Sequence, residues 1–437
     1  MINAKKLKYE NTFRVSSAGY EFNIIDDNWK ISKDTNLNIL KVLGFLSDNL
    51  VEGYLKTLTY FVEEYNDGYV ANIFHSFNFM LNKCEVNYID EAIILNFKSR
   101  LKKHQFNRLR CVKVFLNKWF SLNYPGVDVK VISLFKKIKI KKFGVGDSVK
   151  MKDPQKGPFD MDELQSITDA TESAFKLGRI NINCYVMINL LMKTGRRISQ
   201  LTALKEQNLI EENGKFYVSV PRIKQKGKSI GTNRRVEIDE DLWANLTHMV
   251  NINLDKINEK LGYNISKSLI KKTPIFLSGR SLLNIDEEID ISYYLNNLSL
   301  HIGKISINNA ISLLPKKMNI ILSRTKETLK ISSVRFRYTF ATMLAKTGES
   351  LESIAFALDH SGTDNVGYYV KNLPDNTKDI DKAMAKYLQS ISDIFLGKKI
   401  YEGDSLFKVF ISDIDIEDPK SNVSEMDCEN CKHFNRW

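Results

Sequence analysis

Cysteine is scarce in this chain, and long apolar runs are missing. Five cysteines are scattered over 437 residues, too few for a disulfide framework, so a reducing, intracellular setting is expected. No uncharged apolar run reaches about 18 residues, which argues against a membrane span. The first residues are polar and carry no apolar core of signal-peptide length. The sequence therefore predicts a cytoplasmic protein with no membrane partner.

Positive charge is what the chain has in excess. There are 64 lysines and arginines against 52 acidic residues, for a net charge of +12, and this balance favours an anionic partner. The excess is clustered in residues 98–110 and 136–142. Clusters suit a phosphate backbone, because each neutralised phosphate releases counterions. The ordinary alternative is a solubilising surface, which is also basic or acidic in many proteins.

The first third of the chain predicts a helical domain. Residues 1–30 are a lead-in whose order the pattern leaves undecided. From residue 31 to 122 apolar side chains recur at three- and four-residue spacing, as in the series Val51, Tyr54, Leu55 and Leu58. We expect a small helical bundle with a basic face over this range.

Glycine, proline and lysine are concentrated in residues 123–157, which predicts a basic linker, either part of a clamp around duplex DNA or a plain hinge. A second domain is expected over 158–395, with a buried helix from Ile182 to Met192. Alternating residues at 216–220 and 236–238 predict a strand and its returning partner. The predicted fold class is therefore mainly α with a small antiparallel β-sheet (α+β), followed by a tail at 396–437.

Two arginines lie in short runs with a helical context. Residues 194–201 read TGRRISQL, with Arg197 at the start of a helix just after a glycine stop. Residues 336–342 read FRYTFAT, with Arg337 beside an apolar stripe. An arginine fork meets two oxygens together and stays charged, so the pair suits a phosphodiester. Taken singly, Arg197 is equally consistent with a surface arginine and Arg337 with a side chain along the core edge.

A histidine and a tyrosine follow in the run that begins LDHS at residue 358. His360 ends a predicted helix, where a histidine often serves only as a cap. Tyr369 lies nine residues beyond it, and Tyr368 is the rival by one position. A phenol with a pKa of about 10 is a poor nucleophile at neutral pH. Two guanidinium groups and a histidine nearby would help it lose its proton.

Together these runs resemble the tyrosine recombinase (phage integrase) family, which cuts and rejoins DNA through a phosphotyrosyl link. The resemblance covers residues 158–395 through the order and spacing of its motifs, with a general match to the N-terminal bundle. It implies a helical core-binding domain that contacts DNA, followed by a tyrosine-recombinase catalytic domain. It implies a site-specific recombinase or integrase of a mobile element, which attacks DNA with Tyr369 to leave a 3′-phosphotyrosyl enzyme. Arg197 and Arg337 would hold the nonbridging oxygens while His360 assists.

The resemblance also implies the partners and the cofactors. Double-stranded DNA is the expected partner, bound by a tetramer on two DNA sites, with accessory proteins besides. No cofactor and no metal ion are expected, because the ester keeps the bond energy. A lysine on the β-hairpin would protonate the leaving oxygen. Lys224 is preferred because it comes first after the strand, Lys226 is the next candidate, and a tip that only holds phosphate is the ordinary alternative.

Two positions depart from the family pattern. The family usually has a histidine three residues before the second arginine, and this chain has Val334, with Arg335 as one candidate replacement donor. The residue three after the first arginine is commonly acidic, and here it is Gln200. These departures keep two other functions open: a weak or inactive DNA-binding protein on the same fold, and an enzyme like the type IB topoisomerases.

The tail carries one Cys-x2-Cys pair. Cys428, Cys431 and His433 form at most part of a zinc site, which needs four ligands. An incidental thiol pair is the alternative, and no metal ligand is assigned.

Overall fold

The computed structural model describes residues 12–82, 84–140, 146–222, 233–286, 288–322, 324–360, 362–363 and 366–370. These divide into two compact units, one ending at Val145 and one beginning at Gly146. Each unit is built around a hydrophobic core of its own. The boundary falls inside residues 123–157, where the sequence predicts a linker.

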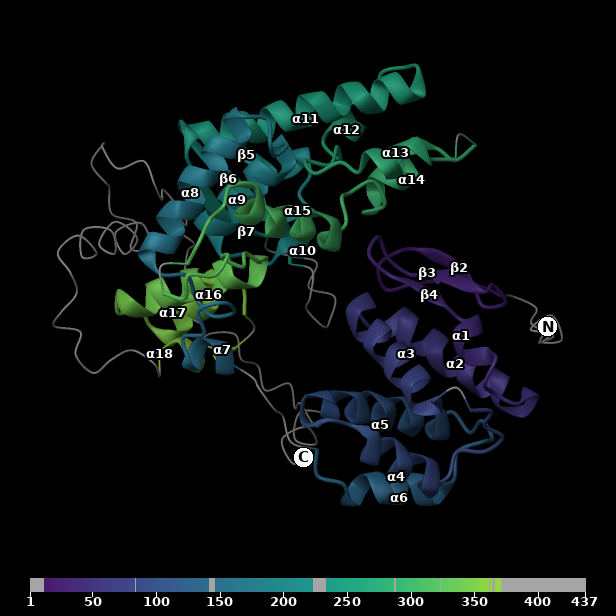
Figure 1. The fold of residues 1–437 in the computed structure, drawn as a ribbon. Helices are drawn as coiled ribbons and strands as arrows, with labels where there is room; N and C mark the ends of the chain where they lie inside the picture. Colours follow the sequence, from purple (N-terminus) through teal and green to yellow (C-terminus); the bar gives the residue numbers. More distant parts are fainter. Residues whose placement is uncertain are drawn as a thin grey trace, which may run out of the picture. The chain divides into compact units, whose positions relative to one another are not determined.

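The first unit consists of two short hairpins and a bundle of helices (Figure 1). Its elements are β1 (Phe13–Val15), β2 (Glu21–Asn23), β3 (Asn28–Lys30), β4 (Asn36–Asn38), α1 (Leu40–Leu43), α2 (Asp48–Glu64), α3 (Asp67–Leu81), α4 (Glu91–Arg100), η2 (Lys103–Gln105), α5 (Phe106–Ser121) and α6 (Val129–Lys137). β1 pairs with β2 and β3 with β4, both antiparallel. Trp29 of β3 is completely buried, so the residues interpreted as a lead-in contribute strands and core to this unit.

Aromatic side chains form the centre of this bundle. Tyr54 of α2 stacks on Phe77 of α3 with 5.2 Å between ring centroids, and Phe77 lies 4.9 Å from Phe115 of α5. Trp119 packs against the same group, and its indole nitrogen donates to the carbonyl of Pro125 at 3.1 Å. The helical spacing of these residues therefore positions a core, as the periodicity predicts.

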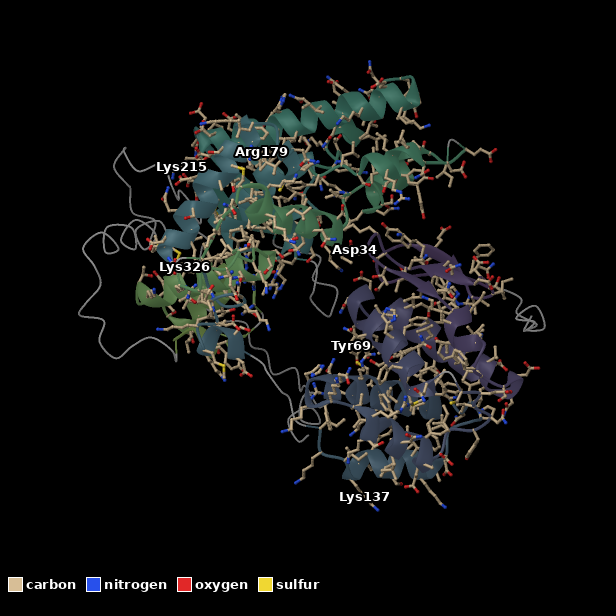
Figure 2. All side chains as sticks on the ribbon, viewed as in Figure 1. Asp34, Tyr69, Lys137, Arg179, Lys215 and Lys326 are labelled. Carbon is tan, nitrogen blue, oxygen red and sulfur yellow. The ribbon has the colours of Figure 1, made fainter. Side chains whose placement is uncertain are left out.

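Helix α6 lies within the range predicted as a linker. Its Val131 and Phe135 are buried in the core of the first unit. The lysines of its last turn, Lys136 and Lys137, are exposed, and Figure 2 shows Lys137 at the outer edge of the unit. The prediction of an unstructured linker is therefore wrong for this stretch, which is an amphipathic helix with a basic end.

The second unit is mainly helical with one small sheet. Its elements are α7 (Asp147–Lys150), α8 (Met161–Lys176), α9 (Ile182–Thr194), α10 (Ile198–Leu201), η3 (Glu206–Asn208), β5 (Leu209–Glu212), β6 (Lys215–Val220), β7 (Arg234–Ile238), α11 (Glu240–Leu261), α12 (Lys267–Ile270), α13 (Gly279–Leu283), α14 (Ile291–Asn296), α15 (Lys304–Lys317), α16 (Ser333–Lys346), α17 (Leu351–Ala357) and α18 (Gly367–Val370). The three strands form an antiparallel sheet in the order β5-β6-β7, with Val218 opposite Val236. The fold class predicted from the sequence, mainly α with small antiparallel sheets, is confirmed.

Helix α9 is the central helix of this unit. Asn181 caps its start by accepting from the backbone nitrogen of Cys184 at 3.0 Å, as N-cap side chains do. Nearly all of its side chains are buried, and α8, α11, α15 and α16 pack against it. It ends at Gly195 in the left-handed conformation, with φ 56°. The predicted buried helix and its glycine stop are thus both confirmed.

A smaller core lies between the end of α11 and the start of α15. We call it the satellite core; its buried members are Ile257, Ile265, Leu277, Leu282, Ile285, Ile291, Leu295 and Leu300. The Lys205 ammonium joins it to the main core by donating to the carbonyl of Leu295 at 2.6 Å. Burial lowers the pKa of Lys205 to about 8. Over the part of the chain that the structure describes, no helix is long and apolar enough to cross a membrane.

Candidate active site

Arg197 is positioned by the sharp turn between α9 and α10. Gly195 reverses the chain with its positive φ, after which Arg196 is 2% exposed and Arg197 becomes the N-cap residue of α10. The Arg197 guanidinium is partly exposed, and its Nη1 donates to the carbonyl of Asp359 at 3.3 Å. Among the described residues no hydrogen-bond acceptor is bound to its Nε or Nη2. These two donors are therefore available to an anion.

Arg337 projects from α16 into the same region. Its Nη1 donates to the carbonyl of Gly195 at 2.9 Å and its Nη2 to the carbonyl of Leu358 at 2.5 Å. Burial lowers the pKa of Arg337 to about 10, and the neighbouring charge of Arg197 lowers it further. Arg337 thus connects the end of α9 to the end of α17 and does not simply run along the core edge.

His360 follows α17, where its backbone nitrogen donates to the carbonyl of Ala355 at 2.8 Å. Burial lowers the pKa of the imidazole to about 4, and Arg337 and Arg197 add to this effect. The side chain is therefore neutral at pH 7, which disfavours a cationic helix cap. Its Nδ1 is buried with no hydrogen-bond partner among the described residues.

The two neighbouring tyrosines of α18 have different surroundings. Tyr369 is 6% exposed, and burial raises the pKa of its phenol to about 12, while Arg337 and Arg197 lower it. The ring of Tyr368 instead lies under Lys150 of α7, 4.7 Å from ammonium to centroid. A Cβ on Gly146 would come within 2.7 Å of that ring. Only Tyr369 of the two therefore interacts electrostatically with both arginines.

Four of the five residues predicted for the site are thus brought together: Arg197, Arg337, His360 and Tyr369. Lys224 and its alternative Lys226 lie outside the described residues, as do Cys428, Cys431 and His433. Within the described ranges, no group of three or more His, Cys, Asp or Glu residues could hold a metal ion.

Asp359 is the site residue that the sequence analysis missed. Its carboxylate is 3% exposed and accepts a hydrogen bond from Gln200 Nε2 at 3.0 Å. Arg222 Nε lies 2.7 Å away without the alignment of a hydrogen bond, so this contact is an ion pair, and Arg234 Nε lies at 3.7 Å. We call Arg197, Gln200, Arg222, Arg234 and Asp359 the Asp359 cluster. The available signal was an acid directly before His360, at a position where a small residue was expected.

Arg335 does not take the place of the family's missing histidine. It is completely buried and donates to the carbonyls of Gly157 at 2.8 Å and Pro154 at 2.9 Å, to that of Lys330, and to the carboxylate of Glu163. All three of its guanidinium nitrogens are occupied in a structural role. Val334 itself is 51% exposed.

No family model matches the chain, and no curated protein matches it. Solved structures do. A structure of lambda integrase (residues 75–356) bound to DNA is 13% identical, covers 76% of this chain and 99% of its own, with a TM-score of 0.43. XerA recombinase is 17% identical, with 77% and 98% covered and a TM-score of 0.33. The Tn1549 transposon integrase in complex with transposon right-end DNA is 15% identical, with 77% and 98% covered and a TM-score of 0.45. At such low identities and TM-scores, function is inferred from this chain's own residues.

Proposed function

We propose that this chain is a DNA strand transferase of the tyrosine recombinase type, a site-specific recombinase or integrase. One observation carries the proposal: the buried Tyr369 shares its electrostatic surroundings with Arg197 and Arg337, which come from two distant runs of the sequence. His360 interacts with the same two arginines. A phenol, two guanidinium groups and a neutral imidazole are the groups that a phosphodiester transesterification requires.

In the proposed reaction, Arg197 and Arg337 hold the nonbridging oxygens of one DNA phosphate. Arg337 is fixed by two backbone carbonyls, so little reorganisation accompanies the build-up of negative charge on the phosphate. The Tyr369 oxygen attacks phosphorus, the bond to the 5′ oxygen breaks, and a 3′-phosphotyrosyl link forms. A 5′ hydroxyl from either strand end reverses these steps and releases the tyrosine. The ester keeps the bond energy, so the scheme uses no nucleotide cofactor.

Two proton transfers accompany cleavage. The Tyr369 pKa of about 12 means that the phenol is protonated at neutral pH before DNA binds. His360 is neutral, and its Nδ1 is without a partner in the described part of the chain, so it can accept a proton or donate to the phosphate. Lys224 is the proposed acid for the departing 5′ oxygen, with Lys226 as the alternative. Both follow Arg222, whose side chain reaches the Asp359 cluster.

Double-stranded DNA is the proposed partner. The net charge of +12 and the exposed lysines at the end of α6 support binding to a phosphate backbone. As for the family that the motifs resemble, we propose a tetramer on two DNA sites, accessory proteins, and service to a mobile element in the cytoplasm.

The test begins by recovering the DNA that the purified full-length chain protects from a random library. A version of that site with a nick close to the cut position traps the covalent intermediate. Wild-type protein should give a denaturant-resistant protein–DNA band, which Tyr369→Phe abolishes and the matched control Tyr368→Phe retains. Replacing Arg337 with lysine should slow band formation about 10²–10³-fold, by analogy with the loss of one oxyanion-hole donor. Binding without a band in the wild type would contradict the proposal.

A second candidate function has one observation in its favour. Val334 offers no donor where the family has a histidine, which fits a DNA-binding protein that does not cleave. The nicked substrate decides between the two. A topoisomerase-like enzyme would form the band but relax one supercoiled circle without exchanging two matched sites.

A further inference from the structure

The Asp359 cluster gathers positive side chains from three separate elements around one buried carboxylate. Gln200 comes from α10, Arg222 follows β6, and Arg234 lies at the start of β7. Arg234 also donates to the carbonyl of Phe356 and stacks over its ring at 3.9 Å. The end of α17 is therefore held against both outer ends of the β6-β7 pair.

The backbone around Asp359 holds the two arginines proposed to bind phosphate. The carbonyl of Leu358 accepts from Arg337 and the carbonyl of Asp359 accepts from Arg197. Both guanidinium groups therefore depend on where these two consecutive peptide units lie. A shift of this turn would move Arg197 and Arg337 together, and His360 next in sequence with them.

Electrostatics requires an acid at this point. Burial and mutual repulsion disfavour the charged forms of Arg196, Arg197 and Arg234, and Asp359 is the neighbour that favours the charged form of each. Buried charges persist only when they are paired, because desolvation is costly. Without the carboxylate, the arginines would repel one another and the turn would lose the groups that fix it.

The residue is also retained in a conformation that few side chains adopt. Asp359 has a φ of 54°, in the left-handed region, which Asp and Asn tolerate better than most residues. The backbone alone would favour glycine here. The carboxylate is therefore the reason that an acid suits this position.

We propose that Asp359 is a positioning residue of the active site, whose carboxylate fixes the turn that aims Arg197 and Arg337 at the scissile phosphate. It does not touch the DNA itself. It acts by holding Arg197 through one nitrogen, which leaves Nε and Nη2 directed to the ligand. The inference rests on the proposed function and deepens it.

Asp359→Asn tests the inference with the least change of shape. Asparagine keeps the size and tolerates the backbone conformation, but removes the charge and places an amide against the arginines. Single-turnover formation of the covalent band should slow about 10–100-fold, as for other groups that orient a functional side chain. Noncovalent affinity for the same duplex should stay the same or rise, because one negative charge is lost. A merely structural role would instead lower binding, cleavage and melting temperature together.

Gln200→Glu provides the matched rescue, because Gln200 Nε2 lies 3.0 Å from the Asp359 carboxylate. Alone, this substitution places two acids in contact and should slow cleavage. Combined with Asp359→Asn, it restores one acid and one amide, so the double variant should cleave faster than Gln200→Glu alone. This comparison holds even if Asp359→Asn by itself fails to fold.

The outcomes separate the inference from the function beneath it. A wild-type protein that forms no covalent band overturns the proposed function and this inference with it. A wild-type band together with equal rates for Asp359→Asn overturns the inference alone. A double variant slower than Gln200→Glu also overturns it.

Discussion

Gly195 combines three structural roles, and its replacement by alanine tests them together. It ends α9 in the left-handed conformation, with φ 56°. A Cβ at this position would lie 2.5 Å from Cδ1 and 2.6 Å from Cγ of Phe340. Its carbonyl also accepts from Arg337 Nη1 at 2.9 Å. The substitution therefore affects the helix stop, the packing and the anchor of one candidate catalytic arginine.

The expected loss has two parts. An L-residue in the left-handed region costs about 1–2 kcal/mol. Forcing a methyl group against the packed Phe340 ring costs about 1–3 kcal/mol more. Gly195→Ala should therefore lower the free energy of unfolding of the second unit by about 2–5 kcal/mol in total. Gly262 is the matched control, because it caps α11 with φ 73° and has no atom within 4 Å of its Cβ position.

Guanidinium unfolding followed by circular dichroism measures both variants on the full chain. Gly262→Ala should show only the backbone part of the loss, with an unchanged slope against denaturant. Gly195→Ala should lose more stability than the control, and its covalent band should form more slowly at a temperature where it stays folded. Equal losses in the two variants, or a normal cleavage rate in folded Gly195→Ala, would refute the reasoning.

Three further predictions follow from other groups. Glu163→Gln removes the buried carboxylate that lies 2.5 Å from Arg324 and 3.3 Å from Arg335; urea unfolding should show a loss of about 3–5 kcal/mol, and a loss no larger than that of a surface variant would contradict this. His360 has its pKa lowered by burial to about 4 from 6.5, so the unfolded chain binds more protons between these values and stability falls as pH falls through that window. His360→Gln should flatten the dependence of unfolding on pH between 4 and 6.5, whereas an unchanged slope would show that another group titrates there. Titrating duplex DNA at several salt concentrations should give a shallower salt dependence, by about 0.9 in the log–log slope per lost phosphate contact, after glutamine replaces the lysines of the basic run, and an unchanged slope would mean that the run does not touch the backbone: Lys136, Lys137, Lys141 and Lys142.

Local patterns predicted what local forces decide. Alternation and a tight-turn signal located the β6-β7 pair, and continuous apolar character located α9, because burial imposes these periods directly. Helix α6 was missed because its lysines dominate the composition and only Val131 and Phe135 report its buried side. The hairpins β1-β2 and β3-β4 were missed because strands of three residues are too short to show a period.

The candidate site divides in the same way. Arg197, Arg337, His360 and Tyr369 could be picked out because each lies in a short run with a recognisable order. Asp359 could not, since its role comes from Arg222 and Arg234, which approach it only after the sheet has packed against α17. Lys224 remains a prediction.

The satellite core has a consequence for how chains of this kind are compared. The two candidate arginines belong to α16 and to the turn before α10, while the satellite core is built from residues that lie between them in the sequence. Extra length there is stabilised by its own apolar contacts and tied down through Lys205, and lengthening a connection has only a slowly growing entropic cost. Evolution can thus lengthen or shorten this interval without moving either guanidinium group. A motif search that demands a fixed spacing between the arginines would reject a chain for a difference that leaves its chemistry untouched.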